Sequence, residues 1–320
     1  MRSFCTGRIE ILPFLRRENG IKCGVLYELW KAAAAGCQVL SGVRDSGFQM
    51  RRPAGSGSHI RKIGDYTVVS CIGKGRYGVC FLALDPKGRK AVLKKFRPHM
   101  WKKNQSANHY EAVILSGLSH PAVPELLGVI NNRKGYYFVL EYKDGSTLEN
   151  ILFRQKKVLR EADIFRIGLQ LFEVLEYLHS RNVVHGDISI ANIIDNGSRI
   201  SLLDFGLARY ADGENMRFSL DYARAANVLL YLLYSRYSGN GRKPWHEELP
   251  LSDQQKNFLK NLFERKETFA DTREVTTGFR ECFAQYQCGS ADLQIDLHHG
   301  KENAKKISWE KKHVWKIFYK

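Results

Sequence analysis

The sequence lacks any apolar run long enough to cross a membrane. Its densest apolar stretch, Val228 to Tyr234, is far shorter than the roughly 20 residues that a transmembrane helix needs. The apolar core of a secretory signal is missing as well. We therefore expect a soluble protein.

Paired cysteines are also absent. The seven cysteines are odd in number and scattered along the chain, and no C-x-x-C pair occurs among them. This pattern favours neither a disulfide framework nor a zinc site, and a cytoplasmic location is its simplest setting. His298 and His299 form an adjacent pair, but no nearby cysteine or carboxylate spacing supports a metal site there.

Acidic residues are few relative to basic ones. The chain has 50 Lys and Arg against 33 Asp and Glu, a net charge of +17. Residues 1–62 hold eleven basic against four acidic residues, and residues 286–320 hold seven against four. Basic flanks favour an acidic partner or a membrane surface, although a solvated surface explains them more simply. No specific nucleic-acid module accompanies the charge, and the oligomeric state is not predicted.

Composition and local pattern divide the chain into three parts. With 44% apolar and 26% charged residues, the chain is able to bury a large core. Residues 1–60 are expected to form a basic, flexible arm that contains the Gly/Ser-rich stretch 53–58 near its end. Residues 61–285 read as one folded domain, and 286–320 as a basic tail.

Within the domain, β-rich segments precede helical ones. Strands are expected over 66–71, 79–84, 90–94, 126–130 and 136–142, with one helix over 106–118. Apolar residues then recur at helical spacing from Ile164 to Leu178, which predicts a long buried helix ending near His179. The sequence thus predicts an α+β protein with a mainly β lobe, 61–142, followed by a mainly α lobe, 143–285.

The glycines Gly73, Gly75 and Gly78 lie between the first two expected strands. Glycine lets the backbone turn sharply and bring its N–H groups close to phosphates. This signal is weak alone, since a tight hairpin explains it equally well. Lys94 strengthens it, because this lysine lies in a strand and precedes a helix whose Glu111 can pair with its ammonium group.

The strongest signal is the stretch His185-Gly186-Asp187, followed by Asn192 and then by Asp204-Phe205-Gly206. Asp187 and Asn192 are five positions apart, and Asp204 follows Asn192 by twelve. This is the order in which a phosphoryl-transfer enzyme holds a hydroxyl substrate and Mg²⁺ around the phosphates of ATP.

Together these motifs resemble the protein kinase superfamily over about residues 63–285. The nearest resemblance is to compact, bacterial-type serine/threonine kinases with H-G-D in the catalytic loop. It implies a bilobal fold, with an antiparallel β N-lobe carrying one main helix and an α-helical C-lobe. It also implies ATP, with Mg²⁺ or Mn²⁺, and transfer of the γ-phosphate to Ser/Thr hydroxyls of protein substrates, including the chain itself.

The resemblance assigns a role to each matching residue. Asp187 would accept or orient the substrate proton, Lys94 would bind phosphates, and Glu111 would hold Lys94. Asn192 and Asp204 would hold the metal ions, and Asp221 would anchor the catalytic loop. The nucleotide-binding set would be Gly73, Gly75, Gly78, Cys80, Val92, Lys94, Leu140, Glu141, Tyr142, Lys143 and Ile194. Leu115, Leu126, His185 and Phe205 match the stacked apolar column of active kinases.

Three departures from the family pattern affect the interpretation. Gly186 replaces the usual Arg, so a receptor for an activation-loop phosphate is absent. Ser189 stands where serine/threonine kinases have a Lys near the catalytic Asp, which weakens turnover or shifts that role to another cation. Only seventeen positions separate Asp204 from Asp221, with no A-P-E triplet between them, so the peptide platform is truncated.

Two other functions stay open at this point. A small-molecule phosphotransferase of the aminoglycoside or choline kinase type would share the H-G-D loop, although the intact Asp204-Phe205-Gly206 favours a protein kinase. A pseudokinase that binds ATP without transfer is the non-enzymatic alternative. It is disfavoured because the five catalytic polar positions, Lys94, Glu111, Asp187, Asn192 and Asp204, are all filled.

Overall fold

The structure is a computed structural model. It describes residues 61–74, 78–97, 105–211, 218–237, 243–264 and 269–287. The expected arm, the expected tail beyond Gln287, Gly75 and the His298-His299 pair lie outside these ranges. Within them, none of the helices combines the length and the apolar character that a membrane span needs.

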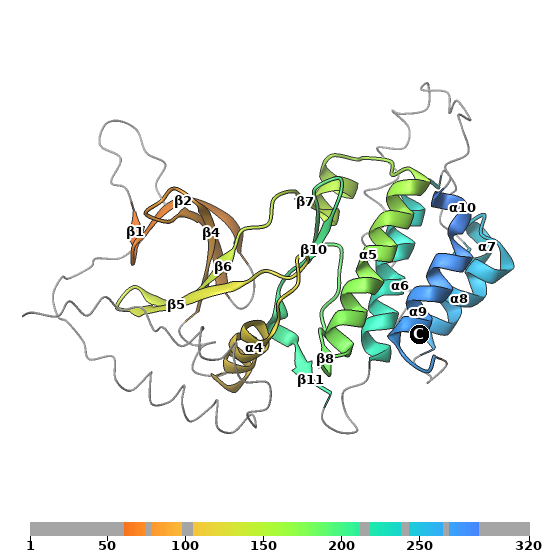
Figure 1. Ribbon diagram of the computed structural model, residues 1–320. Coiled ribbons are helices and arrows are strands. Elements are labelled where there is room, and N and C mark those ends of the chain that lie inside the picture. Colours follow the sequence, from red (N-terminus) through yellow and green to blue (C-terminus); the bar gives the residue numbers. More distant parts are fainter. Residues whose placement is uncertain are drawn as a thin grey trace, which may run out of the picture. The chain divides into compact units, whose positions relative to one another are not determined.

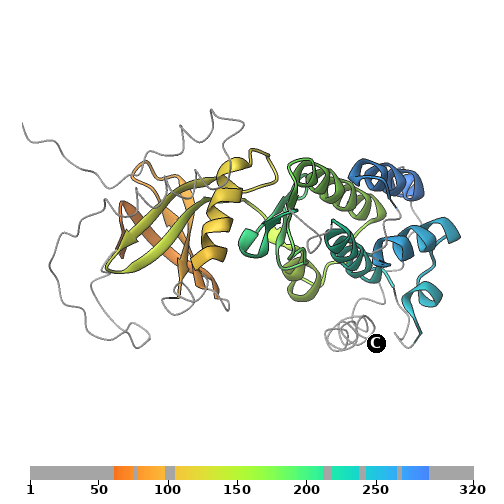
Figure 2. The ribbon, with the colours of Figure 1, turned by 90° about the horizontal axis from the view of Figure 1, so that it is seen from below.

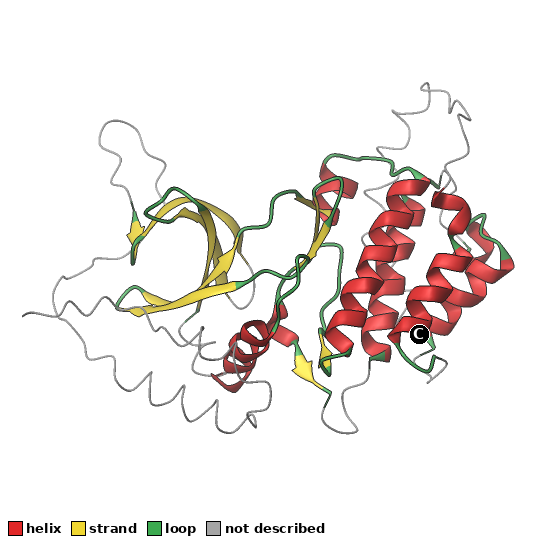
Figure 3. Ribbon diagram, viewed as in Figure 1, coloured by secondary structure: helices red, strands yellow, loops and turns green. Residues whose placement is uncertain are grey.

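The described residues form two compact units. The first contains residues 61–117 and Glu125–Tyr142, and the second contains Leu118–Pro124 and residues 143–287. Strands dominate the first unit and helices the second, as the colours of Figure 3 show. The predicted α+β class is confirmed, and so is its order of a mainly β part before a mainly α part.

The first unit is a curved, antiparallel six-stranded sheet with one helix (Figure 1). Its strand order is β1-β2-β3-β4-β6-β5. The strands are β1 (Lys62–Ile63), β2 (Tyr66–Lys74), β3 (Gly78–Leu84), β4 (Lys90–Phe96), β5 (Leu126–Asn132) and β6 (Gly135–Glu141), and the helix is α4 (Gln105–Gly117). In Figure 2 the helix lies beside the sheet.

Alternation along the strands gives this sheet two distinct faces. One face carries the apolar cluster Ile63, Phe81, Ala83, Ala91, Leu93, Tyr137 and Val139, all of them buried. The opposite face carries Lys94, whose ammonium lies 5.7 Å from the centre of the Phe96 ring. Phe96 also packs edge-on against Phe138, with ring centres 4.8 Å apart. This contact accounts for β4 running two residues beyond the predicted end at Lys94.

The second unit is mainly helical. Its helices are η1 (Asn150–Arg154, a π-helical turn), α5 (Glu161–His179), η2 (Phe205–Leu207, a 3₁₀ turn), α6 (Ser219–Tyr234), α7 (Trp245–Glu248), α8 (Asp253–Phe263), α9 (Thr272–Cys282) and α10 (Ala284–Gln287). Its strands are β7 (Ser146–Thr147), β8 (Val183–Val184), β9 (Ile193–Asp195), β10 (Ile200–Leu202) and β11 (Arg209–Tyr210). They form a small β10-β9-β7 sheet and a β11-β8 pair.

Helix α5, predicted from its apolar spacing, is the centre of the second unit and packs against α6 and α9 (Figure 1). Phenylalanines fill its contact with α9, where the Phe172 and Phe279 rings lie 5.2 Å apart. The helices approach so closely at Gly168 that an added Cβ there would lie 2.4 Å from Phe279. Gly168 is therefore required by packing rather than by backbone conformation.

The segment Leu118–Pro124 belongs to the second unit, although the predicted β lobe, 61–142, includes it. Hydrogen bonds explain this placement. The Leu202 N–H donates to the Ala122 carbonyl over 2.8 Å, and the Ser119 N–H donates to the Tyr177 hydroxyl over 2.6 Å. The Lys143 ammonium donates to the Pro121 carbonyl over 2.8 Å.

Candidate active site

In the first unit, Lys94 and Glu111 form a buried ion pair. The Lys94 Nζ lies 2.6 Å from the Glu111 Oε1, and the side chains are 11% and 2% exposed. A buried ammonium is unstable without such a partner. The helix α4 thus fixes the direction of the lysine that the sequence predicts to bind phosphates.

The predicted nucleotide-binding residues of the sheet share the face of Lys94. Cys80 pairs with Lys94 across the sheet, and Val92 pairs with both Leu82 and Leu140. Cross-strand partners point to the same side of a sheet. Cys80, Val92, Lys94 and Leu140 therefore lie on one face, opposite the apolar cluster, although only Lys94 among them is fully buried.

Two glycines of the Gly-rich segment, Gly73 and Gly78, lie within the described residues, and they differ in whether the fold leaves room for a side chain. A Cβ at Gly78 would lie 2.1 Å from the Lys95 carbonyl oxygen, so the approach of β4 excludes any side chain. A Cβ at Gly73 would meet only the Cys80 Cβ, at an ordinary 3.8 Å. Packing of the sheet thus explains why residue 78 is glycine, but it does not explain Gly73. Close approach of a ligand to the backbone is another reason for glycine at position 73.

The predicted hinge runs from Glu141 to Lys143. The Glu141 N–H donates to the Glu125 carbonyl over 2.9 Å, and the Glu125 N–H donates to the Glu141 carboxylate over 3.1 Å. The Lys90 ammonium lies 4.8 Å from the centre of the Tyr142 ring. These contacts hold the end of β6 in place.

In the second unit, Asp187 and Asn192 lie side by side. The Asn192 side-chain N–H₂ donates to the Asp187 carbonyl over 2.8 Å and to its carboxylate Oδ2 over 3.1 Å. Because the amide nitrogen of Asn192 makes these two contacts, its amide oxygen is the atom that could bind a metal ion. A carboxylate and an amide oxygen are donors that Mg²⁺ accepts in proteins.

Asp221, at the start of α6, anchors the loop that carries His185 and Gly186. Its buried carboxylate accepts hydrogen bonds from the His185 N–H (2.7 Å) and the Gly186 N–H (2.8 Å). His179 Nε2 lies 3.1 Å from the same group. Burial favours a higher pKa, but the hydrogen bond and charge of His179, with help from His185 and Gly186, hold the pKa of Asp221 below its ordinary value. Asp221 therefore acts as an ionised clamp.

His185 links the loop to the segment before Asp204. The Asp187 N–H donates to its Nδ1 over 3.2 Å, and its Nε2 lies 3.1 Å from the Leu203 carbonyl oxygen. Since a carbonyl only accepts, the ring proton is on Nε2 and the imidazole is neutral. Burial lowers the pKa of His185, although the Asp221 charge opposes this. The ring also packs edge-on against Phe205, at 4.7 Å.

Asp204 has a left-handed backbone, with φ of 61° and ψ of 79°. Its side chain accepts a long 3.4 Å hydrogen bond from the Gly206 N–H. The preceding Leu203 N–H donates to the Asn192 carbonyl over 2.7 Å, which ties Asp204 to the loop that carries Asp187. Strained conformations of this kind concentrate at functional sites.

Gly186 has a backbone reason to be glycine. Its φ is +74°, and an added Cβ would lie 3.0 Å from the Leu207 carbonyl oxygen. An L side chain at this φ is strained. The departure from the family's Arg at this position thus accompanies a backbone conformation that suits glycine.

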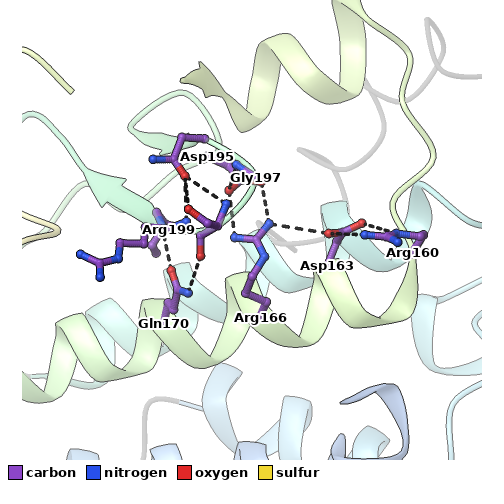
Figure 4. Close-up of polar contacts among 10 residues, drawn as sticks. Arg160, Asp163, Arg166, Gln170, Asp195, Gly197 and Arg199 are labelled. Carbon is purple, nitrogen blue, oxygen red and sulfur yellow. Dashed lines mark hydrogen bonds and ion pairs between the residues drawn. The ribbon is translucent and has the colours of Figure 1, made fainter. Parts of the chain in front are cut away.

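Ile194, the predicted residue beneath the adenine, lies on β9 between Ser201 of β10 and Thr147 of β7. The neighbouring Asp195 fixes this hairpin to α5 (Figure 4). Arg166 donates to both carboxylate oxygens of Asp195 over 2.9 Å, and Gln170 bonds the Ser198 carbonyl and the Ile200 N–H. This bidentate contact sets the position of Ile194.

One residue near Asp187 was not predicted from the sequence. Arg224 of α6 places its guanidinium nitrogen 3.5 Å from the Asp187 Oδ1. A signal did exist, because Arg224 follows Asp221 by three positions, and residues three apart share one face of a helix.

Comparison with known proteins agrees with this arrangement. A family model described as "Protein kinase domain" matches residues 66–239, more than half of the chain. The chain is 33% identical over 220 residues to the probable serine/threonine-protein kinase YbdM of Bacillus subtilis, which covers 66% of the chain and 86% of that relative.

Two other relatives match over smaller parts of their length. The serine/threonine-protein kinase PknA of a Nostoc species is 34% identical over 160 residues, 46% of the chain and 28% of the relative. The probable serine/threonine-protein kinase KIN1 homolog of Enterocytozoon bieneusi is 28% identical over 262 residues, 78% of the chain and 42% of the relative. The chain thus spans less than half of these two proteins.

The chain belongs to the protein kinase family. The predicted superfamily and the prediction of an enzyme of this class are confirmed by the family model and by these relatives.

Proposed function

We propose that the protein transfers the γ-phosphate of ATP, with Mg²⁺ or Mn²⁺, to Ser/Thr hydroxyls of protein substrates, including its own chain. The proposal is carried by the environment of Asp187, which Asn192 contacts and which belongs to a loop clamped by ionised Asp221. The relatives named as serine/threonine kinases support Ser and Thr as acceptors.

In the second unit, the carboxylate of Asp187 is the proton acceptor. The substrate hydroxyl oxygen attacks the γ-phosphorus, the bond from this phosphorus to the bridging oxygen breaks, and ADP leaves. The hydroxyl proton goes to Asp187. Asn192 and Asp204 would hold the metal ion, which when bound would supply positive charge to offset that of the phosphates.

In the first unit, Lys94 binds the α- and β-phosphates and Glu111 holds its ammonium in place. An ammonium has three N–H donors, and one of those of Lys94 donates to the Glu111 carboxylate over 2.6 Å. The face that carries Cys80, Val92 and Leu140 provides the apolar surface for adenine.

The test is the rate of phosphate transfer to a generic protein acceptor. Lys94→Met and Asp204→Asn should each nearly abolish transfer without unfolding the chain, because phosphate and metal contacts act mainly at the transition state. Asp187→Asn should lose about a hundredfold or more, the scale of a positioned base. Arg89→Met, which removes an exposed pair with Asp85, is the control. Wild-type rates in the three site variants would contradict the assignment.

A further inference from the structure

We infer that Arg224 is a positioning residue for Asp187 and supplies the positive charge that the catalytic loop itself lacks at Ser189. The inference rests on the proposed function, since it concerns the same transfer reaction. Its observation is the 3.5 Å contact between the Arg224 guanidinium and the Asp187 Oδ1.

The contact is specific to these two residues. Among the residues that the structure describes, each is the sole ion-pair partner of the other. The side chains are 38% and 37% exposed, so the pair lies at the protein surface and does not seal Asp187 from a substrate. The Nε of Arg224 is buried and has no hydrogen-bond partner in the described part of the chain.

Arg224 lies on α6, the helix whose first turn carries Asp221. Asp221 holds the N–H groups of His185 and Gly186, and Arg224 lies one helical turn further on the same face. The helix therefore contacts the catalytic loop at two points. Asp221 binds the backbone of the loop, and Arg224 contacts the carboxylate of Asp187.

The two oxygens of Asp187 then have different neighbours. Oδ1 faces the guanidinium and Oδ2 accepts from Asn192. An ionised carboxylate has about four acceptor sites, so both contacts leave room for a substrate hydroxyl. Together they fix the rotation of the carboxylate, which sets the direction from which it receives a proton.

Charge also favours this role. Transfer brings a negative phosphoryl group near the anionic Asp187, and a fixed cation beside it offsets the repulsion. Ser189 is neutral, whereas Arg is charged at every relevant pH. Arg224 therefore provides, from a helix, the charge that a loop lysine would provide.

The experiment measures kcat for a protein acceptor and KM for ATP in Arg224→Met. Because the pair is half-exposed, we expect kcat to fall roughly three- to tenfold, with KM for ATP within about twofold of wild type. Arg236→Met is the matched control, since Arg236 has a similar exposure of 31% and pairs with Glu161 away from the loop. Its kcat should match wild type.

Two further variants separate charge from packing. Arg224→Lys keeps the charge and should retain more activity than Arg224→Gln. Ser189→Lys combined with Arg224→Met should recover part of the lost kcat. Equal losses in Arg224→Lys and Arg224→Gln, with no recovery by Ser189→Lys, would overturn the inference even if Arg224→Met proved unstable.

The same assay separates this inference from the proposed function. An active wild type, an inactive Asp187→Asn and an Arg224→Met with the kcat of Arg236→Met would overturn the role of Arg224 alone. An inactive wild type that still binds ATP would overturn the proposed function, and this inference with it.

Discussion

At the scale of single residues, the charge state of His185 decides how the catalytic loop is held. The neutral ring accepts from the Asp187 N–H and reaches the Leu203 carbonyl through Nε2. A proton on Nδ1 would remove the first of these bonds. The loop therefore depends on the imidazole staying neutral within the fold.

This dependence predicts a pH effect on stability. Burial holds the pKa of folded His185 below 6.5, its ordinary value, so the unfolded chain takes up a proton first as the pH falls. The stabilisation is thus present above about pH 6.5 and is lost below it, at up to about 1.4 kcal/mol per pH unit. Asp221, with its lowered pKa, adds to this loss only at much lower pH.

The measurement is the free energy of unfolding between pH 7.5 and pH 5. His185→Phe should be less stable at pH 7.5 but should lose less stability on acidification than the wild type. The same slope in His185→Phe and in the wild type would show that His185 does not titrate on unfolding.

At the scale of elements, the pair β8 and β11 places the segment after Asp204 next to the catalytic loop. Arg209 pairs with Val184 and Tyr210 with Val183, so this segment is held by backbone bonds. Gly186, which follows β8 in the chain, has no side chain to bind a phosphate group, and its left-handed φ favours glycine. Order in this part of the site therefore does not depend on an added charge.

We predict that activity does not require phosphorylation between Leu207 and Leu220. Tyr210 and Ser219 are the hydroxyl residues of that stretch. The double variant Tyr210→Phe and Ser219→Ala should transfer phosphate at a rate within about threefold of the wild-type rate. The reason is that the catalytic loop has Gly186 where an Arg would bind an added phosphate group. The check is the initial rate of transfer. An inactive double variant whose activity returned with Ser219→Glu or Tyr210→Glu would contradict the prediction.

Element-scale features also show what the sequence was able to predict. β-rich composition located β3, β4 and β6 within a few residues, and apolar helical spacing located α5, because each of these elements is long enough to show its pattern. The strands β7 to β11 have two or three residues each, too few for any period. Their existence depends on pairing partners, some of which lie far along the chain, as Thr147 does from Ile194.

The candidate site shows the same division. The sequence predicted that Glu111 would pair with Lys94, and the two side chains are in contact. Motif order placed Asp187 and Asn192 in one site, and they are in contact as well. The contact of Arg224 with Asp187 was not predicted, because it depends on α6 packing beneath the loop. The conformation of Gly186 was likewise hidden, since a sequence shows the absence of a side chain but not the backbone angle behind it.

At the scale of the whole molecule, the two units divide the proposed chemistry. The first unit holds a buried ammonium and an apolar strand face, which suit phosphates and adenine. The second holds a clamped carboxylate and two oxygen ligands, which suit proton transfer and metal binding. The proposed function uses both sets, so we expect transfer activity only from the complete domain.

The most direct test of the central claim is to locate the phosphate by mass spectrometry after the full chain is incubated with Mg²⁺ and ATP. Parallel samples contain a generic protein acceptor, an aminoglycoside or choline. We predict phosphoserine and phosphothreonine on the protein acceptor and on the chain itself, formed about a hundredfold or more slowly with Asp187→Asn. Phosphate on the small molecules alone, or ATP binding without any transfer, would contradict the claim.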